Sequence, residues 1–169
     1  MTRYSASDVV IEMTRRCNMT CDHCLRGDAQ AMDLDMKYVR RLFDKVSYIN
    51  HLTLTGGEPS LVPHIIEAII EEARKRDVSI GSFYMATNGK EVSGEFLVAL
   101  LNLWNYCDDN EEMTRVDISN DIYHDYDEQA YKKLSALRFV GKKNQKDYDS
   151  YEDGLIRAGR VLEIELLVG

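Results

Sequence analysis

Three cysteines lie within eight residues, at Cys17, Cys21 and Cys24, in a chain that has only four cysteines. Thiolates this close together are typical of a metal site. A structural zinc ion needs four protein ligands, usually supplied as two separated pairs, whereas an iron–sulfur cube takes one thiolate on each iron. Three thiolates would leave one iron of a cube open to a small molecule. The spacing therefore favours an iron–sulfur centre with an open iron, and the alternatives are a zinc site or three buried thiols.

A glycine pair forms the second informative stretch. It lies in Gly56-Gly57-Glu58-Pro59, directly after the run His51–Thr55, which predicts a strand. Two glycines allow the backbone to approach a ligand closely, and Glu58 offers a carboxylate. Pro59 restricts the backbone where the chain leaves the turn. A glycine pair alone indicates only a turn.

Together these stretches resemble the motifs of the radical S-adenosylmethionine (radical SAM) enzymes. The cysteines follow the family's C-x3-C-x2-C pattern, with the aromatic His23 just before the last one, and the GGE sequence follows in the expected order. The resemblance covers residues 8–121 well and the remainder poorly. It implies that Cys17, Cys21 and Cys24 hold a [4Fe–4S] cluster whose open iron chelates the amino and carboxylate groups of SAM.

The resemblance also implies roles for residues outside the cysteines. Gly56, Gly57 and Glu58 would hold the methionine ammonium, and His23 would pack near the adenine. Asn88, in the Thr-Asn-Gly turn after a predicted strand, is a candidate SAM or substrate contact, although a plain turn explains it equally well. Ser119 and Asp121 would reach the SAM carboxylate and ribose hydroxyls, with helix capping as the competing explanation.

In the implied reaction, the cofactors carry out the chemistry. A reduced cluster passes one electron to SAM, and the resulting 5′-deoxyadenosyl radical abstracts a hydrogen atom from a substrate. A one-electron donor such as flavodoxin or ferredoxin would be a partner, and no catalytic side chain beyond the cluster is required. The substrate is unknown. The options are a peptide or protein, a glycyl-radical enzyme to be activated, and a nucleotide or metabolite. The rival is a non-catalytic iron–sulfur or zinc-binding module on the same fold.

Cys107 is the remaining cysteine. It continues the apolar face of a predicted helix, three residues after Trp104. A fourth thiolate ligand is conceivable there, but the position predicts a buried, apolar thiol. No cysteine group follows Cys24, so auxiliary clusters are not expected.

Composition sets the remaining expectations. The 169 residues, 44% hydrophobic and 30% charged, predict one soluble globular domain, with its core at about 8–140 and a poorly matched tail at 141–169. No signal peptide or membrane span is expected, and clustered cysteines suit a reducing cytoplasm. The net charge of −8 argues against duplex nucleic acid as the main partner. The acidic stretch 108–128 predicts a solvated surface or, alternatively, a rim that steers a cationic substrate.

Strand and helix patterns alternate along the chain. The predicted strands are Val9–Met13, His51–Thr55, 79–86, 115–119 and a short one at 138–140, with a half-exposed strand at 161–166 after a polar loop at 144–153. The predicted helices begin at Asp33 or Asp35 and run through Tyr48, extend from Pro63 to about Asp77, follow a Ser93 cap, and span 127–137.

This alternation predicts an α/β fold in which a curved parallel sheet forms a partial (βα) barrel with the helices outside. A full eight-unit barrel needs about 250 residues, so a minimal or truncated barrel is expected. Because loops after parallel strands share one rim, the candidate site residues should converge there.

Overall fold

The computed structural model describes residues 3–22, 24–108, 113–120, 124 and 127–144. Its strands are β1 (Tyr4–Thr14), β2 (Val46–Gly56), β3 (Ser79–Thr87), β4 (Arg115–Asn120) and β5 (Val140–Asn144). Its helices are α1 (Met36–Phe43), α2 (Pro63–Lys75), α3 (Gly94–Tyr106) and α4 (Glu128–Leu134), with a short 3-10 helix, η1 (Pro59–Leu61), before α2.

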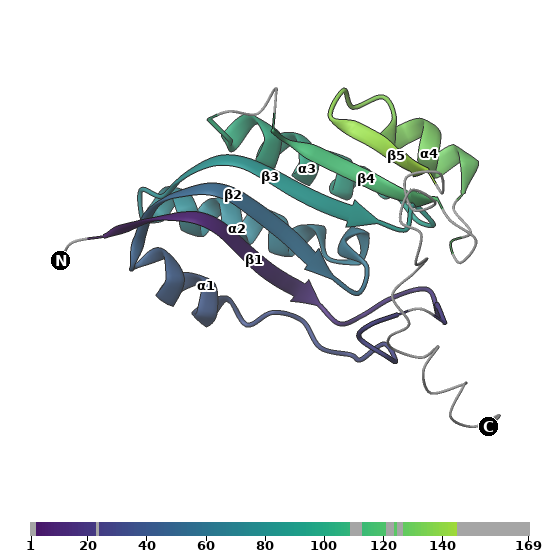
Figure 1. Ribbon diagram of the computed structural model, residues 1–169, viewed down its shortest axis with the longest axis horizontal. Helices are drawn as coiled ribbons and strands as arrows, with labels where there is room; N and C mark the ends of the chain where they lie inside the picture. The colour runs from purple at the N-terminus through teal and green to yellow at the C-terminus, as the bar shows by residue number, and fades with distance from the viewer. Residues whose placement is uncertain (1–2, 23, 109–112, 121–123, 125–126, 145–169) are drawn as a thin grey trace, which may run out of the picture.

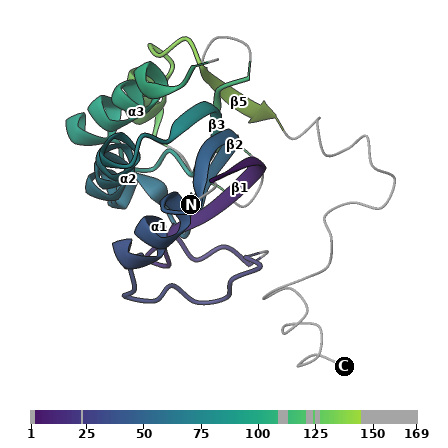
Figure 2. The ribbon, with the colours of Figure 1, turned by 90° about the vertical axis from the view of Figure 1, so that its left-hand side faces the viewer.

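The five strands form one open parallel sheet in the order β1-β2-β3-β4-β5 (Figure 1). Figure 2 shows α1, α2 and α3 along one face of this sheet. The α/β fold expected from the sequence, an open parallel sheet with helices outside, is therefore confirmed. In the described part of the chain, no helix has the length and apolar character needed to cross a bilayer.

The hydrophobic core lies between the sheet and the helices. Alternate residues of each strand point into it, as Leu52 and Leu54 of β2 do, and both are fully buried. Helix α2 contributes an apolar face at helical spacing, formed by Ile65, Ile66, Ile69, Ile70 and Ala73. Near the start of β5, the ring of Phe139 stacks on Trp104 at 5.7 Å and meets Phe83 edge-on at 6.0 Å.

The other face of the sheet carries the polar residues of the same strands. Thr55 of β2 pairs with Glu12 of β1, and Asp117 of β4 pairs with Ala86 of β3. Asp117 is buried and accepts hydrogen bonds from Tyr84 Oη at 3.2 Å and from Arg115 Nε at 2.5 Å. The acidic stretch 108–128 is thus not a uniform solvated surface, because its Asp117 belongs to this sheet face.

The predicted helix through Tyr48 is wrong at its C-terminal end. Helix α1 ends at Phe43, and Val46 already pairs with Tyr4 in the sheet. The β-branched and aromatic residues that follow favour a strand, and pairing with β1 satisfies their backbone groups. The N-terminal cap is Asp35, whose carboxylate accepts from the Lys37 N–H at 2.9 Å.

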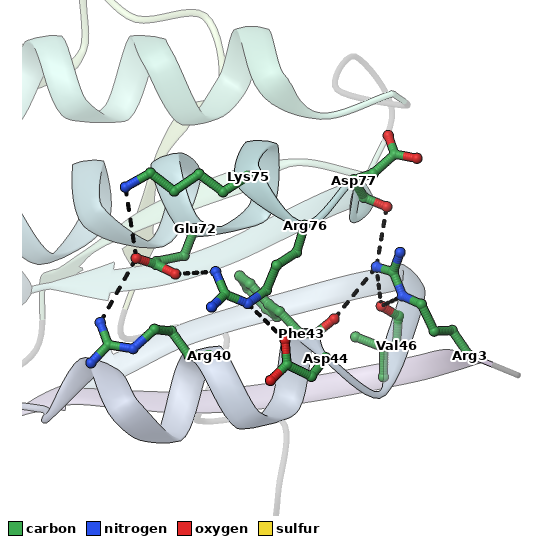
Figure 3. Close-up of polar contacts among 9 residues, drawn as sticks. All are labelled: Arg3, Arg40, Phe43, Asp44, Val46, Glu72, Lys75, Arg76 and Asp77. Atoms are coloured by element: carbon green, nitrogen blue, oxygen red, sulfur yellow. Dashed lines mark hydrogen bonds and ion pairs between the residues drawn. The ribbon is translucent and has the colours of Figure 1, made fainter. Parts of the chain in front are cut away.

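Ion pairs connect α1 and α2 at the end of the molecule where the strands begin (Figure 3). Glu72 of α2 binds Arg76, the residue that caps the C-terminus of the same helix, and Arg40 of α1, while Arg76 also reaches Asp44 at 2.9 Å. Nearby, the Arg3 guanidinium donates to the carbonyl of Val46 and to those of Phe43 and Asp77. These contacts fasten α1 and α2 to the sheet at the end opposite the cysteine loop.

Candidate functional site

The loop that carries the three cysteines begins where β1 ends at Thr14 and returns to the sheet at Asp33. The contacts around Thr14 and Asp33 form the base of this loop, called the neck below. Thr14 and Asp33 form an antiparallel bridge, and the Thr14 hydroxyl donates to Asp33 Oδ1 at 2.5 Å while accepting from the Arg16 N–H at 3.0 Å. The Leu34 N–H then donates to the Met13 carbonyl. The loop that carries the three thiols is therefore closed at its base by side-chain and backbone contacts.

The two glycines after β2 lie against this neck. The Gly57 N–H donates to the Thr14 carbonyl at 2.7 Å, and a Cβ on Gly57 would lie 2.1 Å from the carbonyl oxygen of Arg16. A Cβ on Gly56 would lie 2.5 Å from the Thr14 oxygen. Only glycine permits this approach, because no real Cβ comes so close to backbone oxygen. In this structure the backbone that the glycines approach is that of the cysteine loop.

The Glu58 carboxylate is buried between two loops. It is 1% exposed, caps η1 by accepting from the Ser60 N–H at 3.0 Å, and accepts from Thr87 Oγ1 at 2.6 Å and from the Asn88 N–H at 2.8 Å. Burial raises the pKa of Glu58, and these hydrogen bonds oppose the rise. Glu58 thus joins the ends of β2 and β3.

The three cysteines are free thiols of intermediate exposure. Cys17, Cys21 and Cys24 line one cavity, together with residues 56–58, Asn88 and Ser119. Burial raises the pKa of Cys17, and the nearby backbone N–H groups of Met19 and Asn18 oppose the rise. Among the described side chains, no three cysteine, histidine or acidic groups lie close enough together to hold a metal ion. The thiols therefore share a cavity without converging on one point.

Most of the predicted site residues meet in this cavity. His23 and Asp121 lie outside the described residues, as does the predicted strand at 161–166. Cys107 is buried at the C-terminal end of α3, where the backbone N–H of Asp108 donates to the Ile80 carbonyl at the start of β3. Burial raises the pKa of the Cys107 thiol to about 12. This position, at the end of the sheet away from the cysteine loop, fits the predicted apolar thiol.

Sequence reasoning missed several residues of the cavity. Arg15, Arg26 and His124 also line it. The Arg26 guanidinium binds Glu12 at 2.6 Å and holds the pKa of that carboxyl below its usual value. The position of Arg26, two residues after Cys24, offered a signal for including it. His124 offered none, because no motif surrounds it.

Comparison with known proteins places the chain in a family. The sequence profile described as the Radical SAM superfamily matches residues 11–160. A GTP 3′,8-cyclase of Paenarthrobacter nicotinovorans is 29% identical over 143 residues, covering 80% of this chain and 36% of the relative. A probable GTP 3′,8-cyclase of Sulfurisphaera tokodaii is 28% identical over 142 residues, covering 82% of this chain and 41% of the relative.

An uncharacterised protein of Methanocaldococcus jannaschii is 29% identical over 66 residues, 37% of this chain and 23% of that protein. A solved structure described as native anSMEcpe with bound AdoMet and Cp18Cys peptide aligns with a TM-score of 0.43 at 15% identity, covering 82% of this chain and 51% of the other. The chain spans about a quarter to two fifths of the curated relatives. Because the family profile matches most of its length, the chain belongs to the radical SAM superfamily.

Proposed function

We propose that the protein is a radical SAM enzyme in which Cys17, Cys21 and Cys24 hold a [4Fe–4S] cluster and the surrounding cavity binds SAM. The observation that carries the proposal is the shared cavity. Three free thiols of one loop line it together with residues 56–58, Asn88 and Ser119.

The donor set fits such a cluster. Thiolates are the ligands that iron–sulfur clusters take, and three of them leave one iron for a small molecule. The carboxylate of the glycine motif, that of Glu58, is already engaged by Ser60, Thr87 and Asn88, so it does not compete for metal. When bound, the cluster and SAM supply the one-electron cleavage that yields a 5′-deoxyadenosyl radical.

The chain's own residues have three tasks. The neck contacts of Thr14 fix where the cysteine loop leaves the sheet. Residues 56–58 hold the loop after β2 against that neck, beside the space proposed for SAM. Arg26 links the loop to Glu12 and contacts Thr55 Oγ1 at 3.5 Å, so it covers part of the polar sheet face where a substrate would lie.

A nucleotide is the substrate to test first, because two relatives carry the name GTP 3′,8-cyclase. Their identity to this chain is below 30% and they are more than twice its length, so GTP serves as a probe of substrate class. Peptides form the second class to be tested. A one-electron donor and a cytoplasmic setting follow from the proposed chemistry.

Cysteine substitution tests the proposal. The wild-type protein, reconstituted anaerobically, should hold iron and sulfide in roughly 4:4 ratio and release 5′-deoxyadenosine from SAM when reduced. Cys21→Ala should lose both properties, whereas Cys107→Ala, which removes a thiol at the other end of the fold, should keep them. Zinc without sulfide in the wild-type protein, or a cluster indifferent to SAM, would instead support a non-catalytic binding module.

A further inference from the structure

Two arginines lie at matching positions on either side of the cysteine motif. Arg15 comes two residues before Cys17, and Arg26 comes two residues after Cys24. Both side chains bind the same carboxylate, that of Glu12 in β1. Arg26 Nε lies 2.6 Å from one of its oxygens, and Arg15 Nε lies 3.3 Å from the other. One side chain of the sheet therefore binds both ends of the segment that carries the three thiols.

Each of these arginines also has a second partner. Arg26 Nη2 lies 3.5 Å from Thr55 Oγ1, and Thr55 is the residue of β2 that pairs with Glu12 in the sheet. Arg15 Nη1 donates to Gln30 Oε1 at 3.4 Å, and the Gln30 N–H donates to the Arg15 carbonyl at 2.9 Å. The network therefore joins two neighbouring strands to the outgoing and the returning parts of the cysteine loop.

Arg26 lies inside a backbone turn of the cysteine motif. The Gly27 N–H donates to the Cys24 carbonyl at 3.1 Å, and the Cys24 N–H donates to the Cys21 carbonyl at 3.1 Å. Gly27 has a φ of 70°, the left-handed conformation that glycine adopts readily. These two consecutive turns carry two of the three thiols. The Arg26 side chain anchors the second turn to β1 through its contact with Glu12.

We propose that Glu12 is a positioning residue for the cysteine loop: through Arg15 and Arg26, it holds both ends of the segment that carries the three thiols. A loop that is already held in place loses less conformational entropy when it binds a cluster. The hold on the two turns does not depend on the proposed function, whereas the effect on a cluster rests on it.

Hydrogen exchange tests the hold on the turns. It is measured by nuclear magnetic resonance on the full chain without a cluster, so that the N–H groups of Cys24 and Gly27 are resolved. Glu12→Gln and Arg26→Gln should each speed exchange at these two groups by about fivefold, the effect expected for a partly exposed ion pair. Glutamine at position 12 has one oxygen and no charge, so it cannot bind both arginines as the carboxylate does. In the double variant the two effects should not add, because each substitution removes the same contact.

Glu71→Gln is the matched control for this experiment. It makes the same chemical change at an exposed ion pair, that of Glu71 with Lys75 in α2, and should leave exchange in the turns unchanged. Wild-type exchange rates in Glu12→Gln would overturn the proposal. Fully additive effects in the double variant would overturn it as well.

The rate of iron release tests the effect on a cluster. After anaerobic reconstitution, Glu12→Gln should release iron to a chelator about fivefold faster than the wild-type protein. Its urea midpoint should stay unchanged, because the three side chains of the network are 34–47% exposed and contribute little to global stability. A purely structural contact would instead lower the midpoint, and that result would overturn the positioning role.

Two further outcomes separate this inference from the proposed function. Faster exchange in Glu12→Gln with an unchanged rate of iron release would overturn the positioning role while leaving the cluster in place. If the wild-type protein assembles no cluster, the proposed function fails, and the exchange experiment alone decides whether Glu12 holds the loop.

Discussion

The Asn88 N–H donates to Glu58 Oε2 at 2.8 Å, joining two loops that are 30 residues apart in the sequence. Asn88 directly follows β3, and Glu58 follows β2, so the contact fixes the end of one strand against the end of its neighbour. The same carboxylate accepts from Thr87 Oγ1 and from the Ser60 N–H. A buried carboxylate with three donors thus organises the wall of the cavity that the three cysteines share.

We expect Glu58 to make the stability of the protein depend on pH. Burial raises its pKa in the folded state, so the folded protein binds this proton more tightly than the unfolded chain does. Its contribution to the free energy of unfolding is then full below the ordinary carboxyl pKa and is lost as the pH rises through the raised value.

Urea unfolding of the wild-type protein and of Glu58→Gln, at intervals from about pH 4 to about pH 8, checks this expectation. The difference between the two free energies of unfolding should shift in favour of Glu58→Gln as the pH rises. A difference that stays constant across this range would contradict a raised pKa.

Gly57→Ala should destabilise the protein and loosen the cysteine loop. The added Cβ would lie 2.1 Å from the Arg16 carbonyl oxygen, so the backbone of one loop has to move. The expected loss is about 1–3 kcal/mol in the free energy of unfolding, together with lower iron uptake. Thermal unfolding and iron analysis provide the two readouts.

Gly94→Ala is the matched control. Gly94 is the first residue of α3, and a Cβ there meets no atom within 4 Å. Alanine favours the helix, so this variant should be as stable as the wild-type protein or more so. If Gly57→Ala behaved like Gly94→Ala, the close approach at the neck would not explain the glycine pair.

Glu72→Gln should lower stability without affecting the cavity. The Glu72 side chain is 13% exposed and binds Arg40 and Arg76, which connects α1 to α2 (Figure 3). Losing the charged hydrogen bond to Arg76 and the ion pair with Arg40 should cost about 1–3 kcal/mol in the free energy of unfolding. Iron uptake in the folded variant should match the wild-type protein, since these contacts lie away from the cysteine loop.

Glu71→Gln provides the comparison for this surface. Glu71, the residue before Glu72, is exposed and pairs only with Lys75 among the described contacts. Replacing Glu71 should therefore leave the unfolding midpoint unchanged. Equal effects of the two substitutions would show that the Glu72 contacts contribute no more than an exposed pair.

Much of the fold could be predicted because periodic patterns reflect burial. The apolar face of α2 and the strand before Gly56 are visible in the sequence, and both occur in the structure. The true lengths of β1 and β2 were less visible. The strand residues outside the predicted segments include Asp8 and Asn50, which are exposed and polar. The alternation of apolar and polar residues therefore does not extend to the strand ends.

The candidate site was predictable only where a short motif carries it. Each of the two motifs is compact in sequence, whereas two partners of Glu58, Thr87 and Asn88, lie 29 and 30 residues further along the chain. Nothing in the sequence indicates that Glu58 caps η1 or that Asn18 meets Asn88. Contacts between loops depend on strand register, which a single sequence does not fix in advance.

The most direct test of the proposed function is electron paramagnetic resonance of the reduced, anaerobically reconstituted protein with and without SAM. The shared cavity predicts a [4Fe–4S]⁺ signal whose shape changes when SAM binds to the open iron, and no such signal in Cys21→Ala. Iron-loaded wild-type protein with a [4Fe–4S]⁺ signal that SAM leaves unchanged would contradict the central claim that this cavity joins the cluster to SAM.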